Sequence, residues 1–166
     1  MSLDNFQISV GLTTELYKNS LVALDTPQIK SNSLKPQSLN FLGKNQKQIL
    51  ILVNDNEAVH LNDADTVLLT GILNACKLNF NDIALLNLSQ LSEIDLALLK
   101  DHFNPNVMIA FDINLNSIGI DQYYDNFVIN NLKTITFLNA TSLSQIGKNV
   151  EEKKQLWSCL KSIFSI

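Results

Sequence analysis

Arginine is absent from this chain, in which all 12 basic residues are lysines. The planar guanidinium group that grips phosphate or guanine through two parallel hydrogen bonds is therefore excluded. A compositional bias toward Asn, Lys and Ile explains the missing arginines equally well. The formal net charge of −4 argues further against a general nucleic-acid binder, because such proteins normally carry a basic surplus. We expect no direct sequence-specific binding of nucleic acid.

Glycine, cysteine and long apolar runs are also scarce. With 5 glycines, the chain has no Walker loop, no GxGxxG loop and no GxSxG-like nucleophile elbow. The 2 cysteines, Cys76 and Cys159, fall in predicted helices without metal-ligand spacing, which indicates neither a disulfide framework nor a metal centre. The run "ILILV" is far too short to span a bilayer, and the N-terminus has no basic, signal-like region. We therefore expect a cytoplasmic protein without a cofactor, a metal or a membrane contact.

From Gln48 onward, apolar runs alternate with helical patterns. The runs "QILILV", "DIALLNL" and "NVMIAFDI" are typical of strands that are buried on both faces, and "NFVI" with "KTITFL" predicts a hairpin or a fourth strand with a short partner. Helical patterns cover residues 64–78, 91–103 and the stretch after Asn149. This alternation predicts an α/β fold, a three-layer α/β/α arrangement around a central, mostly parallel four-stranded sheet.

Capping residues mark two of these helices. Asn62 or Asp63 is a natural N-cap for the first, and Asn149 for the last, with Glu152 at the reciprocal position of a capping box. The predicted apolar face of the last helix consists of Leu156, Trp157, Leu160, Ile163 and Phe164.

The N-terminal part of the chain has a different character. Apolar residues recur at helical spacing from Leu12 to Leu24, and the polar stretch that follows has no acidic residue between Asp25 and Asp55. We predict a helical partner-binding segment with its linker over residues 1–37, either detachable or docked, and a globular domain over residues 38–166. A short strand, residues 38–42, is turned back by "GKNQ" into the next strand. The lysines of the linker region are either solvated or make weak, salt-sensitive phosphate contacts; they are Lys30, Lys35, Lys44 and Lys47.

Ligands of open parallel sheets bind outside the carboxyl ends of the strands. The loop after the first core strand concentrates polar side chains there, namely Asn54, Asp55, Glu57, His60 and Asp63. One imidazole with several carboxylates suits a divalent metal or acid/base chemistry, but the spacing matches no known ligand pattern. Solvated turns and helix caps are the simpler interpretation. His102, near the end of the second helix, fits a structural role beside the helix C-terminus.

The stretch "ILILVNDNEAVHLNDADTVLLTGILNACKLNFNDIALLNL" has the order of strand, polar loop, helix and second strand. In this order it resembles the uracil-DNA glycosylase superfamily, in which the loop is the active-site loop. "TITFLNATSLSQIGKNVEEKKQLWSCLKSIF" resembles its closing segment, in which a His-Pro-Ser motif precedes the last helix. Asn139, Ala140 and Thr141 stand in place of that motif, so the histidine that stabilises the departing uracil anion is replaced. The resemblance implies a retained architecture with lost catalytic groups. It implies a vestigial pocket of Asn54, Asp55, Glu57, Asn87 and Asn139.

Three stretches follow one another in a recognisable order; they are "VGLTTELYKNSLVAL", "SLNFLGKNQKQILILVND" and the terminal "LWSCLKSIF". In these segments and their order the chain resembles the psi subunit family of bacterial DNA polymerase III, whose members are non-catalytic. The resemblance implies an adaptor in DNA replication that binds clamp-loader subunits and pairs with a chi-like subunit. The implied clamp-loader contacts are Leu12, Thr13, Leu16, Tyr17 and Leu21. The missing arginines and the stretch "FDINLNSIGIDQYYDNFVI" depart from the family pattern.

The sequence is also compatible with other functions. One is a divergent glycosylase in which Asp55 or Glu57 activates water, Asn139 holds the base, and Asn54 and Asn87 line the pocket. A flipped base also needs a stacking aromatic ring, and the loops at the strand ends supply none. A nucleotide- or base-binding domain that uses the corner between Asn54 and Asn139 is a related alternative. A domain with an unrelated ligand is the third.

Overall fold

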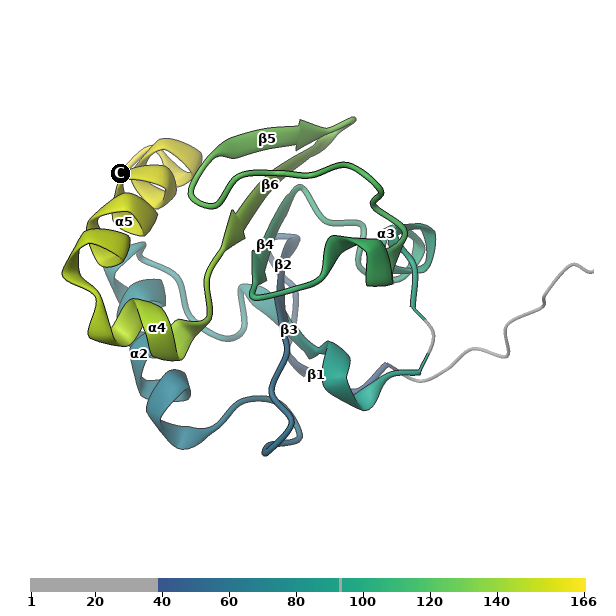
Figure 1. The fold of residues 1–166 in the computed structure, drawn as a ribbon, viewed down its shortest axis with the longest axis horizontal. Helices are drawn as coiled ribbons and strands as arrows, with labels where there is room; N and C mark the ends of the chain where they lie inside the picture. Colours follow the sequence, from purple (N-terminus) through teal and green to yellow (C-terminus); the bar gives the residue numbers. More distant parts are fainter. Residues whose placement is uncertain (1–38, 93) are drawn as a thin grey trace, which may run out of the picture. The chain divides into compact units, whose positions relative to one another are not determined.

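The computed structural model describes residues 39–92 and 94–166, which belong to one compact unit, Ser38–Ile166 (Figure 1). The segment predicted to bind a partner, residues 1–37, lies outside the described residues. Its helix and its clamp-loader contacts therefore stay predictions. Within the described part of the chain, no helix combines the length and the apolar character that crossing a membrane requires.

A six-stranded mixed sheet forms the centre of the domain, in the order β1-β3-β2-β4-β6-β5. The α/β class is confirmed, whereas the prediction of four strands is wrong. The four central strands are parallel: β2 (Ile49–Val53), β3 (Ile83–Asn87), β4 (Val107–Phe111) and β6 (Ile135–Ala140). An antiparallel strand flanks them on each side, β1 (Phe41–Gly43) beside β3 and β5 (Ile129–Leu132) beside β6. These edge strands are short and partly exposed, so they lack the apolar runs that identify the central strands.

The connection between β1 and β2 differs from the predicted hairpin. β1 pairs with β3, and the turn after it passes the start of β3, where the amides of Asn45 and Lys47 donate to the carbonyls of Ile83 and Asp82, both at 2.9 Å. Gly43 makes this route possible, because its φ of +114° is one that side chains disfavour. A Cβ atom there would lie 2.2 Å from the carbonyl oxygen of Ile83.

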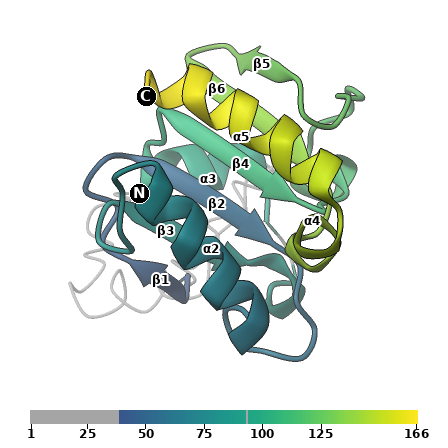
Figure 2. The same cartoon turned by 90° about the vertical axis from the view of Figure 1, so that its left-hand side faces the viewer.

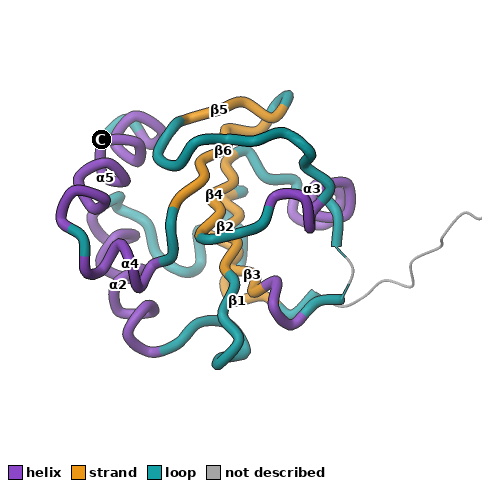
Figure 3. Tube along the Cα trace, viewed as in Figure 1, coloured by secondary structure: helices purple, strands orange, loops and turns teal. Residues whose placement is uncertain are grey.

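Helices cover both faces of the sheet. Helices α2 (Asp63–Ala75), α4 (Leu143–Lys148) and α5 (Val150–Phe164) lie on one face, as Figure 2 shows. Helix α3 (Leu96–Phe103) and the short 3-10 helix η2 (Leu115–Ile118) lie on the other, and a second 3-10 helix, η1 (Leu88–Gln90), follows β3 (Figure 3). Alternate residues of β2 supply both cores: Ile49 and Ile51 face α2 and α5, while Leu50 and Leu52 face α3. This double burial explains why the central strands are apolar throughout.

The predicted caps set the helix starts. The Asn62 side chain accepts from the amide of Asp65 at the start of α2, and Asn149 accepts from those of Glu151 and Glu152 at the start of α5. Helix α3 was predicted to start near residue 91 but begins at Leu96. The reason is that Asp95 is the N-cap of the helix, since its carboxylate accepts from the amide of Leu98 at 2.7 Å.

The structure corrects two predictions about α5. Glu152 does not return a bond to the amide of Asn149, because that amide donates to the Gln145 carbonyl at the end of α4. The helical pattern places Trp157 on the apolar face, for packing in the core or at an interface. In the structure 36% of it is exposed and it belongs to neither core, which excludes the core alternative. It lies one position beyond the buried Leu156, which turns it about 100° around the helix toward solvent.

Candidate functional site

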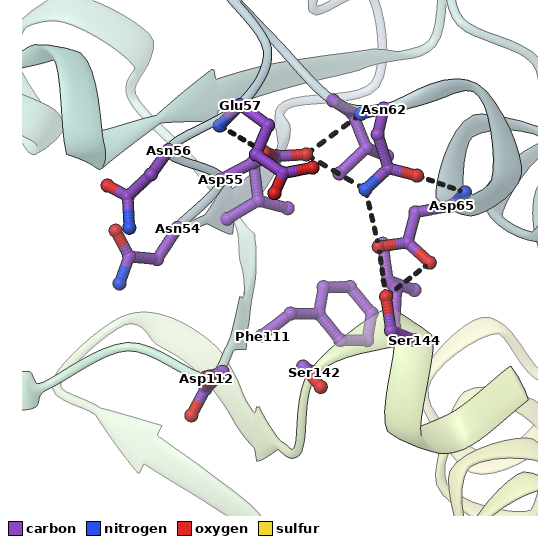
Figure 4. Close-up of a pocket in the computed structure, with 13 residues that line it drawn as sticks. Asn54, Asp55, Asn56, Glu57, Asn62, Asp65, Phe111, Asp112, Ser142 and Ser144 are labelled. Carbon is purple, nitrogen blue, oxygen red and sulfur yellow. Dashed lines mark hydrogen bonds between the residues drawn. The ribbon is translucent and has the colours of Figure 1, made fainter. Parts of the chain in front are cut away.

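A cleft of about 340 Å³ opens at the carboxyl ends of β2 and β4 (Figure 4). This is the edge of the sheet at which α/β folds bind ligands. The loop after β2, the start of α2, the end of β4 and the start of α4 form its walls. The lining residues are Val53, Asn54, Asp55, Asn56, Glu57, Leu61, Asn62, Asp65, Phe111, Asp112, Ser142, Leu143 and Ser144.

The carboxylate of Asp55 holds the loop after β2 together. Its Oδ1 accepts from the amides of Glu57 and Ala58 at 2.9 and 3.2 Å, and its Oδ2 accepts from the amide and the side chain of Asn62 at 2.8 and 2.9 Å. Burial alone would raise the pKa of Asp55, but these four bonds favour the charged form and leave the pKa below its ordinary value. Asp55 is therefore an ionised structural acceptor.

Asp65 ties α2 to α4 and is buried. The hydroxyl of Ser144 donates to its Oδ2 at 2.8 Å, and the side-chain amide of Asn62 donates to the same oxygen at 3.0 Å (Figure 4). The carboxylate also stands in the first turn of α2, where the helix dipole favours a negative charge. The hydrogen bonds of Asp65 thus hold α2 and α4, two walls of the cleft, in place against each other.

Asn87, at the end of β3, is 2% exposed and is not among the residues that line the cleft. Its Oδ1 accepts from the amide of Asp55 at 3.0 Å, while its Nδ2 donates to the carbonyls of Asp55 and Ala58 at 2.7 and 2.9 Å. Asn87 consequently holds the backbone of the loop after β2 in place, and its side chain has no free group to offer a ligand.

Asn139 lies on the other face of the sheet from the cleft. Its neighbours Leu138 and Ala140 belong to the core under α2 and α5, so the alternation of β6 turns Asn139 toward the side of α3. Its Nδ2 donates to Asn126 Oδ1 at 2.8 Å, and its buried Oδ1 has no partner. Asn54 lines the cleft with an exposed side chain, whereas Asn139 does not line it. The two asparagines therefore do not form one corner.

Thr141, at the third position of the replaced motif, pairs with the last helix. Its hydroxyl donates to Glu152 Oε2, and Gln145 and Asn149 donate to Glu152 Oε1 at 2.9 and 3.0 Å. The Thr141 bond is the main reason that the pKa of Glu152 lies below its ordinary value. These contacts position α4 against α5, so Thr141 acts here in structure.

Sequence reasoning missed part of the cleft. Phe111 lies at its floor, and Asp112, Ser142 and Ser144 complete its wall (Figure 4). Phe111 ends the third core strand, "VMIAF", and Asp112 follows it, so their place at a carboxyl strand end was a usable signal. Ser142 caps a helix that no periodic pattern announced, because α4 has only six residues.

Four carboxylates, of Asp55, Glu57, Asp65 and Asp112, line the cleft without a lysine beside them. Phosphate is a poor ligand for such a lining. His60 and Asp63, the other polar residues of the predicted loop, do not line it. Among the described residues, no group of three His, Cys, Asp or Glu side chains is arranged to hold a metal ion.

Comparisons with known proteins add no family assignment: no family model matches the chain, and no curated protein does so either.

Proposed function

We propose that this protein is a non-catalytic adaptor subunit of the bacterial replicative DNA polymerase, resembling psi. It binds clamp-loader subunits through its N-terminal segment, and a chi-like subunit is a further partner for its globular domain. Support comes from the psi-like order of sequence motifs and from the polar groups at the carboxyl edge of the sheet.

The state of Asp55 is the observation that carries the non-catalytic part of the proposal. A general base needs a free lone pair and a pKa near the working pH. Asp55 accepts four hydrogen bonds from its own loop, and its pKa is lowered. A carboxylate in this state is a weak base, which favours a structural loop over a water-activating one.

The N-terminal segment supports the adaptor part. Leu12, Leu16, Tyr17, Leu21 and Leu24 follow the spacing of an amphipathic helix that lies in a partner's groove. Glu15 and Lys18 fall on the opposite side of the same helical pattern. The segment therefore offers both anchors and a matched set of control positions.

The test is affinity purification of the tagged full-length protein from its native cells, with mass spectrometry of what accompanies it. We expect clamp-loader subunits, and at least tenfold less of them with the Leu16→Ala/Tyr17→Ala variant. The control, Glu15→Ala/Lys18→Ala, leaves the net charge unchanged and should retain them. Equal recovery by a truncated protein that starts at Gln28 would contradict the proposal.

A second candidate is a glycosylase-like or base-binding domain, which the cleft over Phe111 favours. Phe111 supplies an aromatic ring at the floor, although only 3% of it is exposed. Excision and binding on oligonucleotides that contain uracil or hypoxanthine test this candidate. Excision that is lost in the Asp55→Asn variant and kept in Asp112→Asn would replace the adaptor proposal with an enzyme.

A further inference from the structure

Lysines gather at the amino edge of the sheet, opposite the cleft. Strand starts and helix ends meet at this edge, where Figure 2 places the ends of α2 and α5. Two of the lysines lie in the turn between β1 and β2, one in the β5–β6 turn, and the others at or just after the ends of α2, α3 and α5. These lysines are Lys44, Lys47, Lys77, Lys100, Lys133 and Lys161.

Carboxylates neutralise this edge only in part. Asp82 is buried and lies 3.7 Å from Lys47, and Asp101 is exposed beside Lys100. By contrast, Lys44, Lys77 and Lys133 are exposed and form no ion pair with another described residue. The net charge of −4 therefore hides a local surplus of positive charge at the amino edge.

Acidic residues are concentrated at the other edge. They follow the strands or open the helices there, and they are Asp55, Glu57, Asp63, Asp65, Asp95, Asp112, Glu151 and Glu152. The sheet thus separates a basic edge from an acidic one. The C-termini of α2, α3 and α5 carry partial negative charge that offsets some of the lysine charge at the amino edge. The exposed lysines still make this edge the more favourable one for an anion.

The shape and composition of the amino edge suit a polynucleotide. It runs along six strands, or about 24 Å at roughly 4.8 Å for each of the five gaps between them. Exposed amide side chains, which donate to phosphate, stand among the lysines; they are Gln46, Asn79, Asn81, Asn104 and Asn106.

Apolar anchors of the kind that dominate protein interfaces are in short supply at this edge. The most exposed large apolar side chains in the described part of the chain are those of Val59, Val67, Tyr123 and Val150. Val59 follows β2, while Val67 and Val150 lie in the first halves of α2 and α5, toward the acidic edge. Two less exposed apolar side chains lie near the amino edge, Ile166 after α5 and Leu42 in β1, at 40% and 37%. Charge with so few apolar anchors favours a phosphodiester backbone over an acidic protein.

We propose that the amino edge of the sheet binds the phosphate backbone of a nucleic-acid strand without reading its sequence. The lysines act as point charges along the strand, and the absence of arginine leaves no bidentate group to read bases. This inference goes beyond the adaptor function and does not depend on it, because it concerns residues outside the N-terminal segment.

The test is fluorescence anisotropy of a labelled dT20 oligonucleotide with the full-length protein between 20 and 200 mM NaCl. The variant Lys44→Gln/Lys77→Gln/Lys133→Gln removes three unpaired lysines from the amino edge. The control Lys148→Gln/Lys153→Gln/Lys154→Gln removes the same charge from the region where α4 meets α5, at the acidic edge. Thermal unfolding of both variants establishes that they are folded.

We expect the amino-edge variant to bind dT20 at least fivefold more weakly at low salt than the wild type. The affinity should also depend less on salt. The slope of log affinity against log salt should become less negative by about 2, because each phosphate that a lysine neutralises contributes roughly −0.7 to it. The control should stay within twofold of the wild type. A duplex of the same length, measured in parallel, tells whether a flexible single strand is preferred.

Three results would overturn the inference. The first is no binding of dT20 or the duplex at 20 mM NaCl, and the second is an equal loss in both triple variants. The third is binding of poly-glutamate as tight as that of dT20 with the same lysine dependence, which would assign the edge to an acidic protein partner instead.

Discussion

The two edges of the sheet use their polar residues in opposite ways. At the carboxyl edge, Asp55, Asp65 and Asn87 accept or donate several hydrogen bonds each within the domain. At the amino edge, Lys44 and Lys133 project into solvent and form no ion pair with another described residue. A polar cluster at a strand end is therefore not a functional site by position alone. Side chains that have no hydrogen-bond or ion-pair partner within the domain are better indicators of a functional site.

Gly43→Ala should have the largest effect and would break the amino edge itself. The new methyl group would meet the backbone carbonyls of Ile83 at 2.2 Å and Phe80 at 2.5 Å, at a φ that alanine disfavours. We expect a loss of about 3 kcal/mol or more in the free energy of unfolding, measured by urea denaturation. Gly71→Ala is the matched control, because its methyl group meets nothing within 4 Å in the middle of α2 and should stabilise the protein by about 0.5–1 kcal/mol. Equal stability of the two variants would refute the proposed route of the β1–β2 turn.

Asn87→Ala should have the next largest effect and tests whether the carboxyl edge is structural. The change leaves the amide of Asp55 and the carbonyls of Asp55 and Ala58 without their partner. We expect a loss of about 2–3 kcal/mol in unfolding free energy, because these groups are partly buried. Asn81→Ala, an exposed asparagine near the amino edge, should cost less than about 0.5 kcal/mol. If Asn87→Ala were as harmless as this control, the loop after β2 would not depend on Asn87.

Asp55→Asn should cost about 1 kcal/mol at pH 7, since the asparagine cannot accept at both of its terminal atoms and the loop is partly solvated. The folded-state pKa of Asp55 is lowered, so its stabilisation is complete above the unfolded pKa of about 3.9 and is lost as the pH falls through the folded value. The gap between wild type and variant should therefore shrink below about pH 4. Urea denaturation from pH 7 to pH 3 measures it.

The control for this pH series is Asp112→Asn. Asp112 lines the same cleft, is exposed and has a φ of 53°, which asparagine tolerates well. Its stability should change by less than about 0.5 kcal/mol at either end of the pH range. A gap at Asp55 that stays constant from pH 7 to pH 3 would show that its charge does not stabilise the loop.

Lys47→Met should have the smallest effect. Its ammonium lies 3.7 Å from Asp82, and its side chain is 52% exposed, so the pair contributes about 0.5 kcal/mol or less. Adding salt should reduce this contribution further. A loss above about 1.5 kcal/mol in urea denaturation would indicate that Asp82 depends on this lysine as a buried charge does.

Much of the fold could be predicted from the sequence because its strongest signals are local. The continuous apolar runs of β2, β3 and β4 indicated strands buried on both faces, and the alternation of β2 between the two cores shows why. The sequence also indicated the caps, Asn149 for α5 and either Asn62 or Asp63 for α2, of which the structure shows Asn62. Caps can be predicted because a side chain that accepts the first amides of a helix acts within a few residues.

Pairing partners and short elements could not be predicted in the same way. β1 looked like one arm of a hairpin with β2, but its partner is β3, some 40 residues later in the chain. Helix α4 spans less than two turns, too few for a hydrophobic period. The helical pattern of α5 placed Trp157 on its apolar face, yet its side chain is exposed. Each of these outcomes depends on which surfaces meet in three dimensions.

The candidate site shows the same division. Asn54, Asp55 and Glu57 were placed at the cleft by their position after a strand, and they line it. Asn87 ends β3 and Asn139 lies one residue before the end of β6, yet Asn87 is enclosed beneath the loop after β2 and Asn139 turns to the opposite face of the sheet. Whether such a residue lines the cleft depends on the face of the sheet to which the strand turns its side chain and on the packing of the adjacent loop.

The sequence by itself determined the α/β class, the central strands and the helix caps, because apolar periodicity and capping depend on near neighbours. Only the tertiary structure decided the edge strands, the hydrogen-bond partners of Asp55, the enclosure of Asn87, and the separation of acidic and basic edges. Hydrogen-bond partners and charge surpluses arise between residues far apart in the chain, and they exist only once the sheet has brought its strand ends together.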